Sequence, residues 1–215
     1  MTPNKEDYLK IIFELGGAHA KINNKQIVTG LNVSAASVSE MMSKLLKDGY
    51  VEHTPYQGVQ LTDAGLLKAG ILIRKHRLWE VFLVEHLGYS WNQVHDEAEV
   101  LEHVTSGTLA DRLENYLEFP DICPHGGVIP DKDGTIVEQT LPTLIEAKVN
   151  EMIELKRVLD DRELLDYLVA AGLKIGDRCS VYEVGAYEGP ITLIKDDEKI
   201  QISYKAACNM FIQIL

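Results

Sequence analysis

Residues 23–65, NNKQIVTGLNVSAASVSEMMSKLLKDGYVEHTPYQGVQLTDAG, contain the pattern that decides the fold. The pattern predicts a short helix over residues 24–30, a turn, and a second helix over residues 34–47 that begins at a serine cap. The segments YVEHT and GVQLT, within residues 50–62, flank a loop with proline and glycine, as expected for a β-hairpin. An amphipathic helix is predicted over residues 4–16. Together these elements have the order of a winged helix-turn-helix.

The second helix of the pair has small polar residues on its leading face and apolar residues behind them. Such a face suits the DNA major groove, because short side chains allow close approach and hydroxyl groups reach phosphates and base edges. A serine-capped amphipathic helix without DNA contacts is the alternative. The candidate DNA-binding residues are Ser34, Ala35, Ala36, Ser37, Ser39, Lys44 and Lys47.

Charge is unevenly distributed along the chain. Residues 1–60 have six basic and six acidic side chains, whereas residues 61–140 have six and fourteen. A neutral DNA-binding module attracts phosphate only weakly, so we expect two copies, in a dimer, to bind two half-sites. The acidic middle third suits a cation-binding core, although acidic surfaces also serve solubility.

Composition places the chain among globular proteins. Hydrophobic residues make up 46% and charged residues 25% of the sequence, and no apolar run is long enough for a membrane span. The first residues lack the basic and apolar regions of an export signal, and the three cysteines are odd in number and far apart. We therefore expect a cytoplasmic protein with reduced thiols and no membrane partner.

Three helices are predicted after the hairpin, over residues 62–88, about 91–106 and about 108–118. The first is apolar on more than one face, which fits either a dimer interface or packing within one subunit. From about residue 141 the pattern gives a mixed-charge helix or a strand, and from residue 164 short strands separated by glycines. The predicted fold class is mainly α with small β parts (α+β), ending in a small SH3-like β-barrel.

Potential metal ligands recur at helical spacing in the acidic middle third. His95, Glu99, Glu102 and His103 form one stripe, and His76 and Glu80 stand one turn apart on the preceding helix. The loop CPHG adds Cys123 and His125. A packed histidine and a solvated acidic face are the ordinary alternatives. Ligands that are mostly oxygen, with one or two imidazoles, favour Mn²⁺ or Fe²⁺ over a structural zinc site.

Enzymatic metal chemistry is the main rival interpretation, and the sequence argues against it. There is no His-Glu-x-x-His motif, no Glu-x-x-His ending at His103, and no phosphate-binding glycine loop. A metal-dependent hydrolase and a metal-independent adaptor with an SH3-like module remain as alternatives.

The segments RKHRLWEVFL (74–83), HDEAEVLEHV (95–104) and CPHGGVIP (123–130), together with the winged helix, resemble the diphtheria toxin repressor family of metal-dependent transcriptional regulators. The resemblance covers essentially all 215 residues, and LVAAGLKIGDRCSVYEV (168–184) resembles the SH3-like (FeoA-like) module of the longer members. It implies a DNA-binding domain over 1–70, a helical dimerisation and metal-binding domain over 71–140, and an SH3-like domain over 141–215.

The resemblance implies a repressor that binds double-stranded operator DNA as a homodimer and controls manganese-uptake genes. The first metal site would comprise Asp7, Glu99, Glu102 and His103, and the second His76, Glu80 and His95 with Asp160 or Glu163; Cys123 and His125 are further possible ligands. Iron-sensing members have methionine and cysteine where this chain has Asp7 and Glu99, which favours Mn²⁺ and the manganese-responsive, streptococcal type. An Fe²⁺-responsive repressor is the alternative, and Zn²⁺ or Cd²⁺ would bind in vitro.

Overall fold

The computed structural model describes residues 1–137 and 140–215, which form two compact units. The first unit comprises Met1–Leu78, Glu99–Tyr116 and Ile129–Val137. The second comprises Trp79–Ala98, Leu117–Val128 and Glu138–Leu215. Within the described residues, none of the helices combines the length and the apolar character needed to cross a bilayer.

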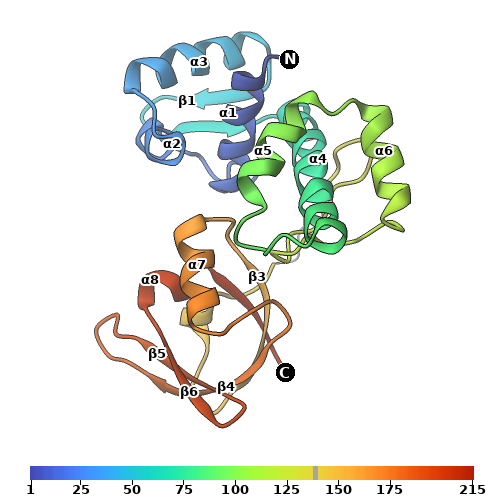
Figure 1. Cartoon of the computed structure of the whole chain (residues 1–215). Helices are drawn as coiled ribbons and strands as arrows, with labels where there is room; N and C mark the ends of the chain where they lie inside the picture. The colour runs from blue at the N-terminus through green and yellow to red at the C-terminus, as the bar shows by residue number, and fades with distance from the viewer. Residues whose placement is uncertain (138–139) are drawn as a thin grey trace. The chain divides into compact units, whose positions relative to one another are not determined.

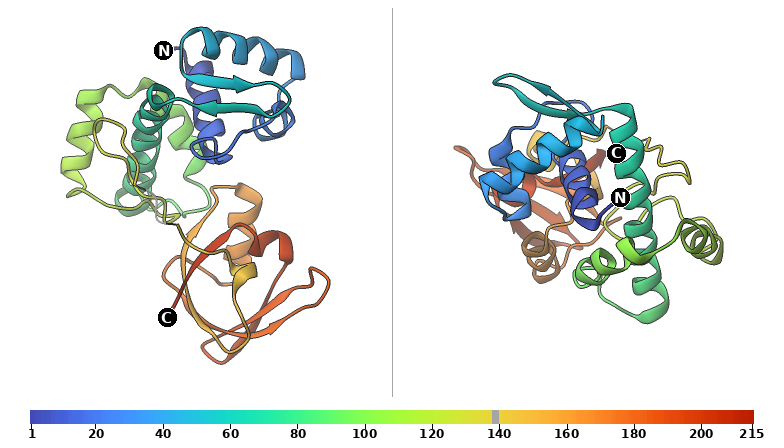
Figure 2. Two further views of the ribbon diagram at one scale, coloured as in Figure 1. Left: turned by 180° about the vertical axis from the view of Figure 1, so that it is seen from behind. Right: turned by 90° about the horizontal axis from the view of Figure 1, so that it is seen from above.

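The first unit begins with the predicted winged helix-turn-helix (Figure 1). Its elements are α1 (Pro3–Glu14), α2 (Asn24–Leu31), α3 (Ala35–Lys47), β1 (Val51–Thr54) and β2 (Gly58–Leu61). The antiparallel strands β1 and β2 can be followed side by side from the front and from behind in Figures 1 and 2. The prediction of this module is confirmed, with boundaries that shift by one or two residues.

Local signals explain why these helices begin and end where they do. Asn23 and Gln26 form a reciprocal capping box at the start of α2, and Asn32 ends the helix in the left-handed conformation with φ 51°. Ser34 then accepts a hydrogen bond from the backbone N–H of Ser37 at 3.1 Å, which caps α3. The buried faces of these helices and of the hairpin share one hydrophobic core, which includes Leu9, Ile12, Ile27, Val38, Leu45 and Val59.

Three helices follow the hairpin: α4 (Asp63–Leu87), α5 (His95–Val104) and α6 (Gly107–Tyr116). Helix α5 begins at His95 and not near Trp91 as predicted, because residues 91–93 form turns before the helix. Arg74 on α4 is buried and forms ion pairs with Asp111 and Glu114 on α6, at 2.9 and 2.6 Å.

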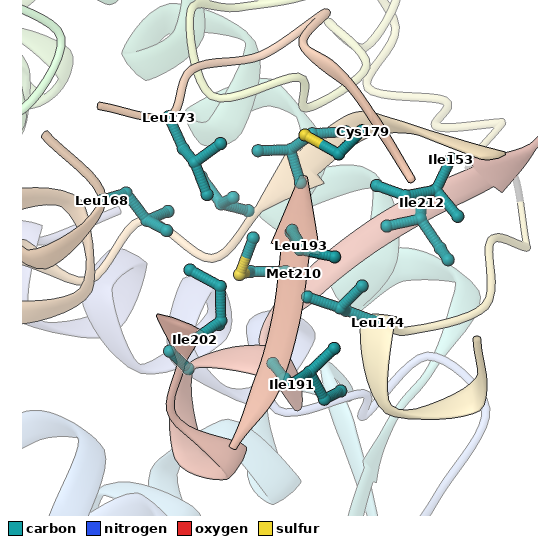
Figure 3. Close-up of a cluster of buried hydrophobic side chains, with 14 of the residues drawn as sticks. Leu144, Ile153, Leu168, Leu173, Cys179, Ile191, Leu193, Ile202, Met210 and Ile212 are labelled. Carbon is teal, nitrogen blue, oxygen red and sulfur yellow. The ribbon is translucent and has the colours of Figure 1, made fainter. Parts of the chain in front are cut away.

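The carboxy-terminal part of the second unit is a five-stranded antiparallel sheet in the order β6-β5-β4-β3-β7. Its elements are a 3-10 helix (Leu144–Glu146), β3 (Met152–Val158), α7 (Arg162–Ala170), β4 (Arg178–Val184), β5 (Ile191–Lys195), β6 (Glu198–Ile202), α8 (Tyr204–Ala207) and β7 (Met210–Ile214). Leu144, Leu168, Leu193, Met210 and Ile212 belong to its buried core, shown in Figure 3.

Three details of this part correct the prediction. The segment for which the sequence allows a helix or a strand contains a short 3-10 helix followed by the strand β3. Helices α7 and α8 interrupt what was predicted as a succession of strands. The sheet does not close into a barrel among the described residues, since its edge strands β6 and β7 pair only on one side.

Candidate metal centres

One group of potential ligands lies within the first unit, on α1 and α5. Asp7 from α1 and Glu99, Glu102 and His103 from α5 each offer one ligand atom, and these atoms lie within 4.8 Å of one another. The three residues of α5 share a face because they stand at positions i, i+3 and i+4 of the helix. We call these four residues the α1–α5 cluster.

The imidazole of His103 lies between two carboxylates of α1. Its Nδ1 is 2.9 Å from Glu6 Oε2, and its Nε2 is 2.8 Å from Asp7 Oδ1. When Nδ1 donates its proton to Glu6, Nε2 presents a lone pair to another acceptor, and two acceptors at this distance repel unless a proton or a cation lies between them. Burial raises the pKa of Asp7 above its ordinary value, an effect that the charge of His103 partly offsets.

Glu102 is the most deeply buried member, with an exposed fraction of 0%. Its Oε2 lies 2.6 Å from His76 Nδ1 and 2.9 Å from Lys10 Nζ. Its Oε1, 3.6 Å from His103 Nε2, is buried and has no hydrogen-bond partner among the described residues. A buried carboxylate oxygen of this kind, within a set of three carboxylates and one imidazole, fits a divalent cation such as Mn²⁺.

Two side chains next to this cluster were missed in the sequence. Glu6 holds His103, and Lys10 forms ion pairs with Glu99 and Glu102, each at 2.9 Å. Burial lowers the pKa of the Lys10 ammonium, but the charges of nearby glutamates outweigh burial and raise this pKa above its ordinary value. The one available signal was the position of Lys10, three residues after Asp7 and flanked by apolar residues.

A second group of potential ligands lies within the second unit. Glu80 on α4, Cys123 and His125 are all buried, and their ligand atoms lie within 4.8 Å of one another. His125 Nδ1 is 3.0 Å from Glu80 Oε1 and 3.7 Å from Asp160 Oδ1. We call Glu80, Cys123, His125 and Asp160 the Cys123 cluster.

The CPHG loop is held in place by its backbone. Gly126 donates a hydrogen bond to the carbonyl of Cys123 at 2.8 Å and has φ +80°; a Cβ atom there would lie 1.9 Å from the carbonyl oxygen of Lys156. His125 Nε2 lies 2.7 Å from the carbonyl oxygen of Trp91. Since that carbonyl only accepts hydrogen bonds, Nε2 has a proton, and Nδ1 is the nitrogen available to a metal.

Charge in the Cys123 cluster favours the protonated imidazole when no metal is bound. Burial lowers the pKa of His125, but the charges of Glu80 and Asp160 and the hydrogen bonds that the protonated ring donates to Glu80 and Cys123 outweigh burial and raise this pKa to about 12. A metal ligand must be deprotonated, so binding a cation through His125 displaces this proton. The donor set of carboxylates, imidazole and thiolate fits a first-row transition-metal ion.

The remaining predicted ligands are placed as follows. His95 Nδ1 lies 2.6 Å from Asp160 Oδ2, whereas Glu163 is exposed in the first turn of α7. Of the two carboxylates predicted as alternatives, Asp160 and Glu163, it is Asp160 that contacts His95. His76 stands one helical turn before Glu80 on α4, and its Nδ1 faces Glu102.

The predicted DNA-binding residues lie along one exposed stretch of α3. Ser34, Ala35, Ala36, Ser37, Ser39, Lys44 and Lys47 are all exposed, while Val38, Met42 and Leu45 are buried behind them. Lys44 forms an ion pair with Glu40, one turn earlier on the same helix, at 2.7 Å. The pair reduces the net positive charge that α3 offers to phosphate.

Family models match almost the whole chain in three consecutive pieces. Residues 1–59 match the N-terminal DNA-binding domain of iron-dependent repressors. Residues 62–131 match the metal-binding and dimerisation domain of the same repressors, and residues 143–214 match the FeoA domain.

Comparisons with individual relatives and solved structures agree with the family models. The diphtheria toxin repressor of Corynebacterium efficiens is 30% identical over 193 residues, which cover 84% of each chain. The solved structure of the manganese regulator SloR is 44% identical, with complete coverage of both chains and a TM-score of 0.87. The crystal structure of ScaR with bound Zn²⁺ is 42% identical, covers 99% of this chain and 100% of that chain, and has a TM-score of 0.89.

Proposed function

The chain belongs to the family of iron-dependent repressors, and we propose that it is a manganese-dependent repressor that binds operator DNA as a homodimer and controls manganese-uptake genes. Family members are metal-dependent, DNA-binding transcriptional regulators, not enzymes, which removes the hydrolase and the metal-independent adaptor considered above. We retain the division into residues 1–70, 71–140 and 141–215 as part of the proposal.

The main support for the proposal is that the four residues of the α1–α5 cluster come from two different helices. Asp7 comes from α1, whose buried face packs in the core of the winged helix, whereas Glu99, Glu102 and His103 come from α5. Any ion held by all four residues bridges α1 and α5. Metal binding is thereby coupled to the position of the DNA-binding module.

A bound divalent cation supplies positive charge that offsets the repulsion among the carboxylates of the α1–α5 cluster. Asp7 then fixes the amino-terminal part of α1 against α5, and α1 positions α3 through their shared core. In a dimer, this fixes the spacing between the two α3 helices, which must match two half-sites of the operator. Without the cation, Asp7 and the α5 carboxylates repel each other, and the spacing is less restricted.

The choice of Mn²⁺ rests on the donor atoms. The α1–α5 cluster has oxygen and imidazole donors and no sulfur, which suits a harder ion than a site with methionine and cysteine would. SloR, which is 44% identical, is a manganese regulator. We further propose the Cys123 cluster as the second site, with His95 beside Asp160; His76 stays a predicted ligand because it stands one turn from Glu80 on α4.

The test is fluorescence anisotropy with a labelled duplex from the promoter of a manganese-uptake operon, and with a scrambled duplex of the same composition. Protein is titrated in EDTA, then with Mn²⁺, Fe²⁺ and Zn²⁺ in turn. We expect tight, sequence-specific binding only with metal, and at the lowest metal concentration with Mn²⁺. A preference for Fe²⁺ would favour the iron-responsive alternative, and equal binding in EDTA would reject metal control.

The matched variant is Asp7→Ala. It removes the α1 ligand while leaving the buried face of α1, formed by Tyr8, Leu9 and Ile12, intact. We expect an unchanged circular dichroism spectrum and loss of metal-dependent binding to the operator. Metal-dependent binding as tight as that of the unaltered protein would show that Asp7 has no part in the coupling.

A further inference from the structure

Lys10 is a buried cation next to the α1–α5 cluster. Its ammonium lies 2.9 Å from Glu99 Oε1, 2.9 Å from Glu102 Oε2 and 3.0 Å from His76 Nδ1. The exposed fraction of the whole residue is 4%. A lysine is rarely buried to this extent unless opposite charges surround it.

Lys10 and the four predicted ligands share the same carboxylates. Glu102 presents Oε2 to Lys10 and its other oxygen, Oε1, towards His103. Glu99 is both a partner of Lys10 and a member of the cluster. The negative charge that attracts a divalent cation is therefore already reduced, inside the protein, by one positive charge.

The position of Lys10 on α1 is equally informative. It stands three residues after Asp7, so the two side chains project from adjacent turns of α1 towards α5. Lys10 pairs with α5 in the same region that Asp7 would join through metal. The structure thus contains a metal-independent cation bridge between α1 and α5.

We propose that Lys10 is a built-in counter-ion that sets the metal affinity of the α1–α5 cluster. This inference rests on the proposed function, because it assigns a regulatory role at the same site. The fixed ammonium stabilises Glu99 and Glu102 in the metal-free protein and repels an incoming divalent cation. Metal affinity is thereby held below the value that the carboxylates alone would give, so repression begins only at a higher free metal concentration.

The test replaces Lys10 by methionine, which has similar length and no charge, and by arginine, which keeps the charge. Free Mn²⁺ is measured by electron paramagnetic resonance during titration of each full-length variant, and thermal unfolding is followed with EDTA and with Mn²⁺. For Lys10→Met we expect roughly tenfold or greater tightening of Mn²⁺ binding. We also expect a lower melting temperature in EDTA and a larger increase on adding Mn²⁺, because the buried carboxylates have lost their partner.

Lys10→Arg is expected to bind Mn²⁺ as the unaltered protein does. Lys5→Met is the matched control, since Lys5 also lies on α1 but pairs with Asp48 outside the cluster. Adding Asp7→Asn to Lys10→Met should abolish the gain, which assigns it to this cluster. If Lys10→Met does not fold in EDTA, the same titration is made with Lys10→Gln, which keeps a hydrogen-bond donor for Glu102.

Unchanged or weaker Mn²⁺ binding by the folded, uncharged variant would overturn the inference and make Lys10 an organiser of the site. That result is distinct from failure of the proposed function, in which the unaltered protein binds operator equally well in EDTA and in Mn²⁺. The titration of Mn²⁺ does not depend on DNA, so each idea is tested separately.

Discussion

Nδ1 of His103 lies 2.9 Å from Glu6 Oε2, and the opposite nitrogen of the ring lies 2.8 Å from Asp7 Oδ1. Glu6 therefore holds the ring in the orientation that points Nε2 into the α1–α5 cluster. Carboxylates that orient a metal-binding histidine in this way contribute to affinity without touching the ion.

We expect Glu6→Ala to weaken Mn²⁺ binding by roughly 10- to 100-fold, which is the usual effect of losing such a partner. Glu6→Gln should retain most of the affinity, because its amide oxygen still accepts a hydrogen bond from Nδ1. Isothermal titration calorimetry measures both. Equal loss in the two variants would mean that the charge of Glu6 matters more than its hydrogen bond.

Ser37 tests the DNA-binding face of α3. Ser37→Glu places a negative charge at the exposed third position of α3, where glutamate is well tolerated. We expect operator binding to be lost while Mn²⁺ still binds, because the new carboxylate repels phosphate. Gln201→Glu, which adds the same charge on exposed β6, is the control and should bind DNA normally. Intact DNA affinity in Ser37→Glu would mean that another element reads the groove.

The donor atoms of the Cys123 cluster depend on whether Cys123 is a metal ligand. If its thiolate is a ligand, Co²⁺-loaded protein should show a sulfur-to-metal charge-transfer band in the near ultraviolet. We expect Cys123→Ser to remove that band and to weaken metal binding. Cys208→Ser should leave both unchanged, since Cys208 belongs to none of the ligand groups found among the described residues. A band that survives in Cys123→Ser would identify Cys123 as a buried thiol only.

His125 makes metal binding pH-dependent. Its pKa rises from an ordinary value of 6.5 to about 12 in the metal-free fold. The stability gained from its charged form is therefore fully present below pH 6.5 and declines as the pH rises from 6.5 through about 12. Metal must displace that proton and the thiol proton of Cys123, so Mn²⁺ affinity should increase with pH.

Proton release measures this coupling directly. In weakly buffered solution near pH 7.5 with an indicator dye, we expect about two protons released for each ion bound at the Cys123 cluster. Cys123→Ser should release about one fewer. Binding without proton release would exclude His125 and Cys123 as ligands.

How far the sequence predicts this protein depends on how local each signal is. Asn23, Asn32 and Ser34 cap or end their helices through neighbouring residues, and the winged helix was predicted closely. Helices α7 and α8 were missed because they are short, with nine and four residues, and lie between β-rich segments.

The metal clusters likewise combine a local signal, which the sequence shows, with contacts between distant residues, which it does not. The stripe of Glu99, Glu102 and His103 is visible in the sequence because one helix presents it. Lys10 contacts Glu102 across 92 residues, and His103 contacts Glu6 across 97, so no periodicity reveals these pairs. The grouping of Cys123 and His125 with Glu80 likewise depends on how a distant loop packs, and the sequence left these two residues unassigned.

In the proposed function, metal binding and DNA binding are coupled through Asp7 and α5. Linkage requires the coupling to be reciprocal, so Mn²⁺ affinity should be measured by calorimetry with and without a saturating duplex that binds specifically in the anisotropy assay. We expect the duplex to tighten Mn²⁺ binding by the same factor by which Mn²⁺ tightens DNA binding, and to have no such effect in Asp7→Ala. Identical Mn²⁺ affinity with and without the duplex would show that metal binding and DNA binding are not coupled.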